Sequence, residues 1–310
     1  MTTMCASRWV SNSQAVQAGN EGARAKFWFE EGDGRLSLFK LARKQSGEDW
    51  AEVVAAHLAE RLVIPHASYE LGESEDGPGC ISRSFLEDND SLIDGNSRLR
   101  GFLPDYHAVG VMGRQRRQHT LENIADVLHG VDAPLESAPD RSVLDDGMSV
   151  FVGYLMFDCW IGNTDRHDCN WAVVSRLAET DLAVRLAPSF DHGSSLGSHL
   201  TDVERTLRCE TLDRGRTVSA FADRGRSKIF SVTGGNKPVL LLDAFKDAAR
   251  VRPAVGLEWL ARLERVRECD IDEVVSRLPA ERMSAVSAEF ALRFLKYTRA
   301  QLLRLREGLS

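Results

Sequence analysis

The sequence lacks the cysteine patterns and the basic excess that mark several large classes of protein. Its six cysteines are scattered and none forms a Cys-x-x-Cys pair, so their spacing indicates no zinc site. Scattered unpaired cysteines fit a reducing compartment, and we expect a cytoplasmic protein. The formal net charge is −7, whereas proteins that bind nucleic acid usually carry a basic surface. We therefore expect no direct contact with nucleic acid.

Long apolar runs are also missing. The most apolar stretch, 150–161, is too short to span a bilayer and contains Asp158. The N-terminal segment has no apolar run of the length found in signal peptides. We therefore expect no association with a membrane. The rest of the composition is ordinary: 310 residues, 43% hydrophobic and 27% charged, suit one large or two modest globular domains.

Two aspartates and one asparagine in the middle of the chain form a recognisable pattern. The segment 161–174, IGNTDRHDCNWAVV, places Asp165 five positions before Asn170, and Asp191 follows the next hydrophobic run. Protein-kinase catalytic loops carry Asp and Asn at this spacing, the Asp as base and the Asn as a magnesium ligand. Magnesium prefers hard oxygen donors. The pattern predicts a phosphoryl-transfer site in which Asp165 is the base and Asn170 and Asp191 hold Mg²⁺.

Hydrophobic periodicity predicts a small mixed lobe followed by a larger helical lobe. We expect strands at 27–29 and 36–41 joined by an Asp-Gly turn, a helix over 47–62, and strands at 68–71 and 80–85. Residues 1–26 are expected to be partly mobile, and the polar segment 87–98 is the expected linker. Beyond it we expect a buried helix over 148–161, strands at 171–174 and 183–186, and a helical remainder.

These elements predict an α+β protein with a two-lobed, protein-kinase-like fold. The N-lobe is small and mixed and spans residues 1–90, and the C-lobe is mainly helical and spans residues 91–310. ATP is expected to bind between the lobes. The Gly-rich phosphate loop of ordinary kinases, G-x-G-x-x-G, is absent, and 19–26 is the candidate replacement.

The order of residues in the catalytic loop carries a resemblance to known families. Asp165-Arg166-His167 followed by Asn170 resembles the loop of phosphatidylinositol 3/4-kinases and of bacterial HipA-like kinases. Asn163-Thr164 before this loop, and 186–188, LAP, before Asp191, resemble the HipA-like branch. The segments 38–40, 47–71 and 282–302 resemble that family's ATP-lysine strand, the helix and strand after it, and its closing helix.

The resemblance implies roles for further residues. Lys40 would hold ATP phosphates and Glu52 would position it, while Lys26 is a weaker candidate for a phosphate contact. The segment 82–86, with Ser82 and Phe85, would meet the adenine. ATP and Mg²⁺ are the implied cofactors, and the implied activity is transfer of the γ-phosphate to a serine or threonine hydroxyl of a protein. HipA-like members also act as toxins of toxin–antitoxin pairs, which implies an antitoxin protein as a candidate partner.

Other interpretations of the same residues stay open. A phosphatidylinositol-type lipid kinase would share the Asp-Arg-His order, although it should show a basic membrane-facing surface. The doublet His167-Asp168 also occurs in HD-type metal-dependent phosphohydrolases, which need more His and Asp ligands, such as His119 or His192. Asp165 and Asn170 alone could be a turn pair, and Lys40 and Glu52 could be solvated surface residues. In the kinase interpretation, Arg214, Arg216, Arg224 and Arg226 would contact the acceptor peptide.

Overall fold

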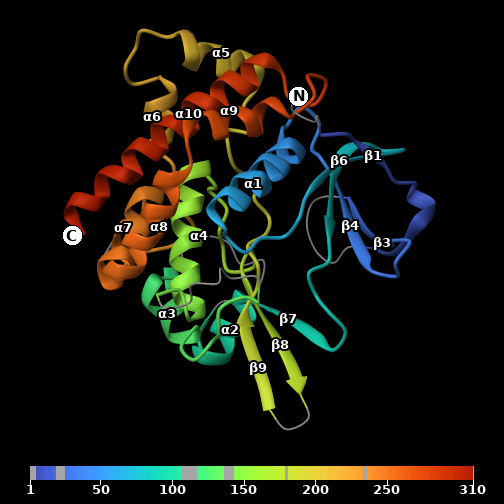
Figure 1. Ribbon diagram of the computed structural model, residues 1–310, viewed down its shortest axis with the longest axis vertical. Coiled ribbons are helices and arrows are strands. Elements are labelled where there is room, and N and C mark those ends of the chain that lie inside the picture. The colour runs from blue at the N-terminus through green and yellow to red at the C-terminus, as the bar shows by residue number, and fades with distance from the viewer. Residues whose placement is uncertain are drawn as a thin grey trace.

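The computed structural model describes residues 5–18, 25–106, 117–135, 143–178, 181–232 and 236–309. The candidate phosphate loop 19–26 therefore lies largely outside the described residues, with 25 and 26 as its visible end. Within the described ranges, the chain forms an N-lobe built on a sheet and a mainly helical C-lobe (Figure 1). None of the helices described is both long and apolar enough to cross a membrane.

A six-stranded sheet forms the N-lobe, in the order β1-β5-β6-β4-β3-β2. The pairs are antiparallel except that β1 runs parallel to β5. The expected hairpin is confirmed, with a turn at positive φ at Gly34 (81°). Phe29 and Phe39 on its buried face pack with Val10 and Ile81. The strands are β1 Arg8–Trp9, β2 Ala15–Ala18, β3 Lys26–Glu30, β4 Leu36–Leu41, β5 Glu70–Ser74 and β6 Gly77–Arg83.

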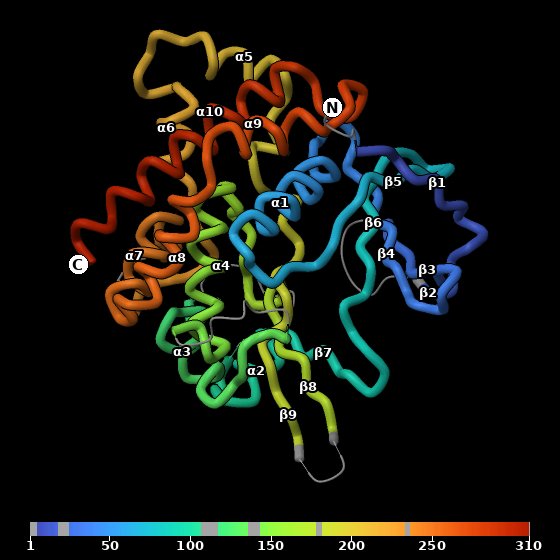
Figure 2. The backbone as a smooth tube through the Cα atoms, in the orientation of Figure 1, coloured from blue at the N-terminus to red at the C-terminus, as the bar shows by residue number. Residues whose placement is uncertain are grey.

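Helix α1, Glu48–Leu62, connects β4 to β5 and lies between the sheet and the C-lobe (Figure 2). Its side chains Trp50, Val53 and Leu58 belong to the same buried cluster as those of α4, α7 and α10, so α1 packs into the core of the larger lobe. The helix ends where Val63 adopts a left-handed conformation (φ 54°) and its N–H bonds back to the last turn.

The C-lobe is built around α4, Gly147–Ile161, every residue of which is buried. A helix that is apolar on all sides is expected at the centre of a large core. It ends at Gly162, whose left-handed φ of 69° and contact with Phe294 leave no room for a Cβ. Helices α7 Leu241–Val251, α8 Pro253–Arg265 and α10 Ala285–Arg304 pack against α4. Helices α5 Asp202–Glu210, α6 Val218–Ala222 and α9 Glu268–Ser276 pack against α10, and α2 Gly95–Phe102 packs against α3 Leu121–Val127.

A second, three-stranded sheet belongs to the C-lobe and holds the two strands that lie in sequence between the Asp165–Asn170 loop and Asp191. Its order is β7-β8-β9, with β7 Asp90–Asp94, β8 Ala172–Ala178 and β9 Asp181–Leu186. The expectation of a linker over 87–98 is wrong from Asp90 onward, because 90–94 pairs with β8 and α2 begins at Gly95. The described part of 1–26 likewise contains β1 and β2 rather than only mobile chain.

Candidate active site

Lys40 lies where β4, the helix α1 that follows it and the distant segment after β9 meet. Its Nζ is 2.9 Å from Glu52 Oε1 on α1 and 2.5 Å from Asp191 Oδ1, which follows β9. The side chain of Lys40 is 15% exposed and that of Glu52 is 1% exposed, whereas that of Asp191 is 37% exposed. The cluster is thus sealed on the α1 side and open at Asp191.

The strand geometry explains why Lys40 faces this point. Phe39 is buried in the core of the sheet, so Lys40 projects from the opposite face. Burial opposes the charged form of Lys40, but the carboxylates of Asp191 and Glu52 outweigh it and hold the pKa of the ammonium well above its usual value. The two carboxylates therefore favour the charged form of Lys40.

The strand register also decides where Lys26 lies. Lys26 pairs directly with Lys40 across β3 and β4, so the two side chains leave the same face of the sheet. A like-charge pair at directly opposite positions is unfavourable unless anions lie nearby. Glu52 and Asp191 supply such anions beside Lys40, and the placement is consistent with a phosphate-binding face.

Glu52 is held from both sides. Its Oε1 accepts from Lys40, and its Oε2 accepts from the backbone N–H of His192 at 2.7 Å. Since His192 directly follows Asp191, one buried carboxylate fixes both the lysine and the segment that carries the aspartate. The alternative interpretation of Glu52 as a solvated surface residue is wrong, because its side chain is 1% exposed and both of its carboxylate oxygens accept hydrogen bonds in the interior.

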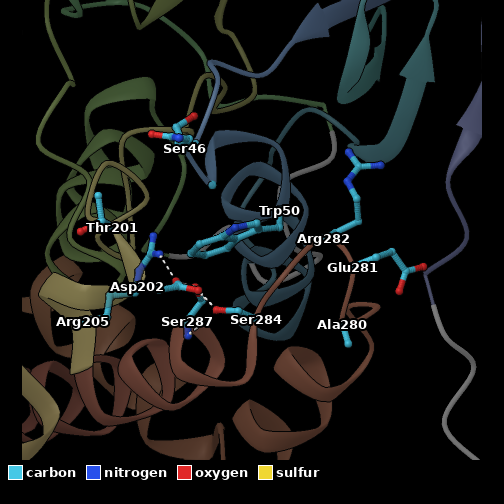
Figure 3. Close-up of a pocket in the computed structure, with 12 residues that line it drawn as sticks. Ser46, Trp50, Thr201, Asp202, Arg205, Ala280, Glu281, Arg282, Ser284 and Ser287 are labelled. Carbon is cyan, nitrogen blue, oxygen red and sulfur yellow. Dashed lines mark hydrogen bonds and ion pairs between the residues drawn. The ribbon is translucent and has the colours of Figure 1, made fainter.

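A separate hollow of about 450 Å³ lies at the start of α1, between α1, α5 and the turn before α10 (Figure 3). Side chains that line it connect the start of α1 to the C-lobe. The Arg205 guanidinium lies over the Trp50 ring at 5.7 Å and donates to Asp202 at 2.8 Å. Arg282 donates to Asp49 at 2.9 Å. Both arginines that line this hollow are thus paired with carboxylates, and their contacts with Trp50 and Asp49 hold the start of α1, the helix that carries Glu52.

Asp191 occupies an unusual backbone conformation. Its φ of 58° is in the left-handed region, which asparagine and aspartate tolerate better than most residues. Its N–H donates to the Tyr69 hydroxyl at 3.1 Å. Burial and the Glu52 carboxylate hold the pKa of Tyr69 well above its usual value, so the hydroxyl stays neutral beside Asp191. This local arrangement turns the Asp191 carboxylate toward Lys40.

Arg166 is a buried residue that holds the loop carrying Asp165 and Asn170. Its guanidinium makes two bonds to Asp158, Nε to Oδ2 at 2.8 Å and Nη2 to Oδ1 at 2.7 Å. It also donates to the backbone oxygens of Asn170 at 2.8 Å and Phe190 at 3.3 Å. Arg166 and Asp158 are 1% exposed. One side chain thus ties the Asp165–Asn170 loop to α4 and to the segment that ends in Asp191.

The side chains of Asn170 and Asp165 differ in their contacts: the first is bonded to the loop backbone, and the second is partly exposed. Asn170 donates Nδ2 to the Asp165 backbone oxygen at 2.8 Å, which leaves its amide oxygen directed away from the loop backbone. The Asp165 side chain is 36% exposed and lies 3.7 Å from Lys228 Nζ. Amide and carboxylate oxygens from Asn170 and Asp191 are the hard donors that Mg²⁺ prefers, so the residues present fit this ion.

His167 and Asp168 support the loop. His167 Nδ1 accepts from the backbone N–H of Cys169 at 3.1 Å, as expected for a structural member of the turn. Asp168 accepts from Asn96 at 2.7 Å and from Tyr106 at 3.0 Å, and is buried. His119, a ligand candidate in the hydrolase interpretation, accepts from Trp171 at 3.1 Å and bonds the Lys228 carbonyl at 2.9 Å, so both of its ring nitrogens are engaged.

The two residues expected near adenine lie at the end of the N-lobe sheet. Ser82 pairs with Leu38 on β4, two residues from the pair formed by Cys80 and Lys40, so Ser82 and Lys40 face the same side. Phe85 stacks with Phe190 at 6.1 Å, and both pack against buried Ala172, Val174 and Ala187. This apolar cluster joins the chain between the lobes to the residue before Asp191.

Sequence reasoning missed three residues that contact the site, and only one of them could have been found from the sequence. Tyr69 gave no signal, because its contact with Asp191 depends on the packing of β5. Lys228 gave none either, since nothing in the sequence links it to Asp165. Asp158 did give one: an acid inside an otherwise apolar helix requires a partner, and Arg166 is the nearest arginine that follows it.

Known structures share this architecture. Neither a protein-family model nor a curated relative matches the sequence. The Helicobacter pylori proinflammatory kinase CtkA matches with a TM-score of 0.73 and 18% identity, over 99% of this chain and 97% of that one. HipA of Shewanella oneidensis MR-1, solved with HipB and operator DNA, matches with a TM-score of 0.55 and 13% identity, over 93% of this chain and 65% of that one. The chain therefore has the two-lobed, HipA-like kinase fold, as the catalytic-loop pattern predicted.

Proposed function

We propose that this protein is an ATP-dependent kinase that transfers the γ-phosphate to a serine or threonine hydroxyl of a protein. The observation that carries the proposal is the contact of Lys40 with both Glu52 and Asp191, at 2.9 and 2.5 Å. An ammonium fixed by a buried glutamate and opposed by a half-exposed aspartate is the arrangement needed to hold phosphates beside a metal ligand. The kinase fold of the structural neighbours supports it.

Each residue then has a chemical task. Lys40, with Lys26 on the same face, would neutralise phosphate oxygens, and Ser82 and Phe85 would border the adenine. Asn170 and Asp191 would hold Mg²⁺, which when bound neutralises charge on the phosphates. Asp165 would accept the proton of the acceptor hydroxyl as its oxygen attacks the γ-phosphorus. Phosphoryl transfer requires positioning and charge neutralisation above all, and Arg166 would supply the rigidity.

The class of phosphate acceptor and a protein partner are proposed from the loop residues and the structural neighbours. A protein acceptor is proposed from the HipA-like order of the loop residues, and it agrees with two structural neighbours, one named as a proinflammatory kinase and the other as part of a toxin–antitoxin system. The exposed arginines Arg214, Arg216, Arg224 and Arg226, around α6, would contact that acceptor. An antitoxin partner is proposed because the Shewanella oneidensis HipA structure contains HipB.

The test is transfer of label from γ-labelled ATP to two acceptors in parallel. One tube contains polypeptides of a cell lysate, and the other contains phosphoinositide vesicles. We expect label in protein, and an Asp165→Asn variant should lose it. As a matched control, Asp247→Asn removes a surface carboxylate that pairs with Arg250 on α7 and should keep full transfer.

Two results would contradict the proposal in different ways. Label in lipid and never in protein would overturn the protein acceptor while leaving the roles of Asp165, Asn170 and Asp191 intact. Absence of label in both tubes, combined with no binding of magnesium-ATP, would overturn the kinase itself.

A further inference from the structure

A lysine from a distant segment faces the candidate base. Lys228 Nζ lies 3.7 Å from Asp165 Oδ1, and the two side chains are 41% and 36% exposed. An ion pair with this exposure is screened by water and contributes little to folding. The feature of this pair that bears on function is therefore its position beside the candidate base and not its stability.

The backbone that carries Lys228 is anchored to the catalytic loop. Its carbonyl bonds His119 Nδ1 at 2.9 Å, and His119 Nε2 accepts the indole N–H of Trp171 at 3.1 Å. Trp171 directly follows Asn170, and the backbone N–H of Phe230 donates to the His119 carbonyl at 2.9 Å. The distance from the Lys228 backbone to the loop is thus set by a short chain of buried bonds rather than by chance contact.

The cationic side chain within the loop itself is used elsewhere. The Arg166 guanidinium is buried and committed to Asp158 and to backbone oxygens. His167 is turned back to the N–H of Cys169. Among the residues that the structure describes, Lys228 is the cation that the ion-pair geometry places beside Asp165. The N-lobe lysine Lys40 is paired with Glu52 and Asp191.

We infer that Lys228 contacts the transferring phosphoryl group, so that the γ-phosphate lies between Lys228 in the C-lobe and Lys40 in the N-lobe. The inference rests on the proposed function. The acceptor oxygen forms a bond to phosphorus while the bond from phosphorus to the bridging oxygen of ADP breaks, and the acceptor proton passes to Asp165. Negative charge is spread over the equatorial oxygens, where a fixed cation stabilises it. Lys228 keeps its own proton throughout.

The first experiment compares nucleotides that differ by the γ-phosphate. Calorimetry measures the affinity of the whole protein for the magnesium complexes of a non-hydrolysable ATP analogue and of ADP. Lys228→Met should weaken binding of the analogue by about tenfold and leave ADP unchanged, because a charge-assisted contact to the γ-phosphate is lost. Lys228→Arg should restore most of the difference. Lys296→Met is the matched control, since it removes a surface pair with Asp272 at 2.9 Å on a distant helix.

The second experiment measures turnover of ATP with the same variants. Lys228→Met should reduce transfer and basal hydrolysis together, because both pass through the same charged phosphoryl group, and its unfolding midpoint should match that of Lys296→Met. An equal loss of affinity for both nucleotides, no loss for either, or higher turnover would each overturn the role of Lys228 while leaving the kinase proposal standing. If the unaltered protein binds neither nucleotide, the proposed function fails and this inference fails with it.

Discussion

Two ion-pair clusters of similar composition lie within the site, and they differ in how completely the protein satisfies them. Arg166 and Asp158 are both buried, and within the described residues the Arg166 guanidinium contacts protein oxygens and the Tyr154 ring. In the Lys40 cluster, Glu52 is equally buried, but the Asp191 side chain is 37% exposed. The first cluster is closed and the second is open on one side.

This difference indicates that the Arg166 cluster supports the structure of the site, whereas the Lys40 cluster can bind a ligand. A buried arginine whose N–H donors are all used has none left for a ligand. Arg166 therefore fixes the position of the Asp165 loop relative to the segment that carries Asp191. The Lys40 cluster contains a cation and an exposed carboxylate whose mutual contact can be exchanged for a ligand that brings phosphates and a metal. The open cluster is therefore the part that a substrate should change, and the closed cluster is the part that a mutation should break.

The largest effect is expected from opening the closed cluster. Arg166→Met leaves Asp158 buried without its partner, which costs about 3–5 kcal/mol of the free energy of unfolding. The matched control is Arg293→Met, which removes a pair with Glu289 whose two side chains are each 51% exposed and should cost less than about 1 kcal/mol. Chemical denaturation measures both. Equal losses for the two variants would show that Arg166 is not the anchor of the loop.

The next largest effect is expected on phosphoryl transfer without an effect on nucleotide binding. Asp165→Asn removes the proton acceptor but leaves Lys40, Glu52 and Asp191 in place, so magnesium-ATP should bind as before while transfer falls by about 10²-fold or more. Calorimetry and a label-transfer assay on the same preparation separate the two steps. If transfer stays near the level of the unaltered protein, Asp165 is not the base.

A smaller effect should show that Lys40 and Glu52 act as a pair. Lys40→Met leaves the Glu52 carboxylate buried beside Asp191, and Glu52→Gln removes the partner charge from the other side. Because the two residues contact each other, we expect a coupling of about 1–2 kcal/mol between the two substitutions in the free energy of unfolding. Strict additivity in the double-mutant cycle would contradict the contact. Both single variants should also lose the stabilisation by magnesium-ATP.

The smallest effect is expected at Tyr69. Tyr69→Phe removes the acceptor of the Asp191 N–H and should cost about 1 kcal/mol of stability together with some affinity for magnesium-ATP. Tyr297→Phe removes a comparable hydroxyl that donates to Asp223 at 2.7 Å on the far helix α10, and should leave nucleotide affinity unchanged. Identical nucleotide affinities for the two variants would indicate that Tyr69 does not position Asp191.

The elements that the sequence predicted are those whose signals are local. Helix α1 and helix α4 have strong apolar periodicity or a fully apolar sequence, and both were predicted to within a residue at each end. Strand β7 was mistaken for a linker because Asp90-Ser91-Leu92-Ile93-Asp94 is polar at both ends, and only its pairing with β8 makes it a strand. Strand β1 has two residues and depends on β5 in the same way.

The same distinction between local signals and tertiary packing applies to the residues of the site. Asp165, Asn170 and Asp191 were predicted because they lie in two short motifs, and Lys40 and Glu52 because their order resembles that of a known family. Their roles remain predictions, although the structure brings Lys40, Glu52 and Asp191 into contact. Lys228 and Tyr69 could not be predicted, because tertiary packing alone brings them to Asp165 and Asp191.

The measurement that tests the central claim most directly is the thermal midpoint with and without magnesium-ATP, for the unaltered protein and for Asp191→Asn. A ligand that binds only the folded state raises the midpoint by mass action. We predict a clear rise for the unaltered protein, its loss when the metal is chelated, and a much smaller rise for Asp191→Asn relative to its own ligand-free midpoint. No rise at millimolar magnesium-ATP, or an equal rise in the variant, would contradict the assignment of the Lys40, Glu52 and Asp191 cluster as the nucleotide site.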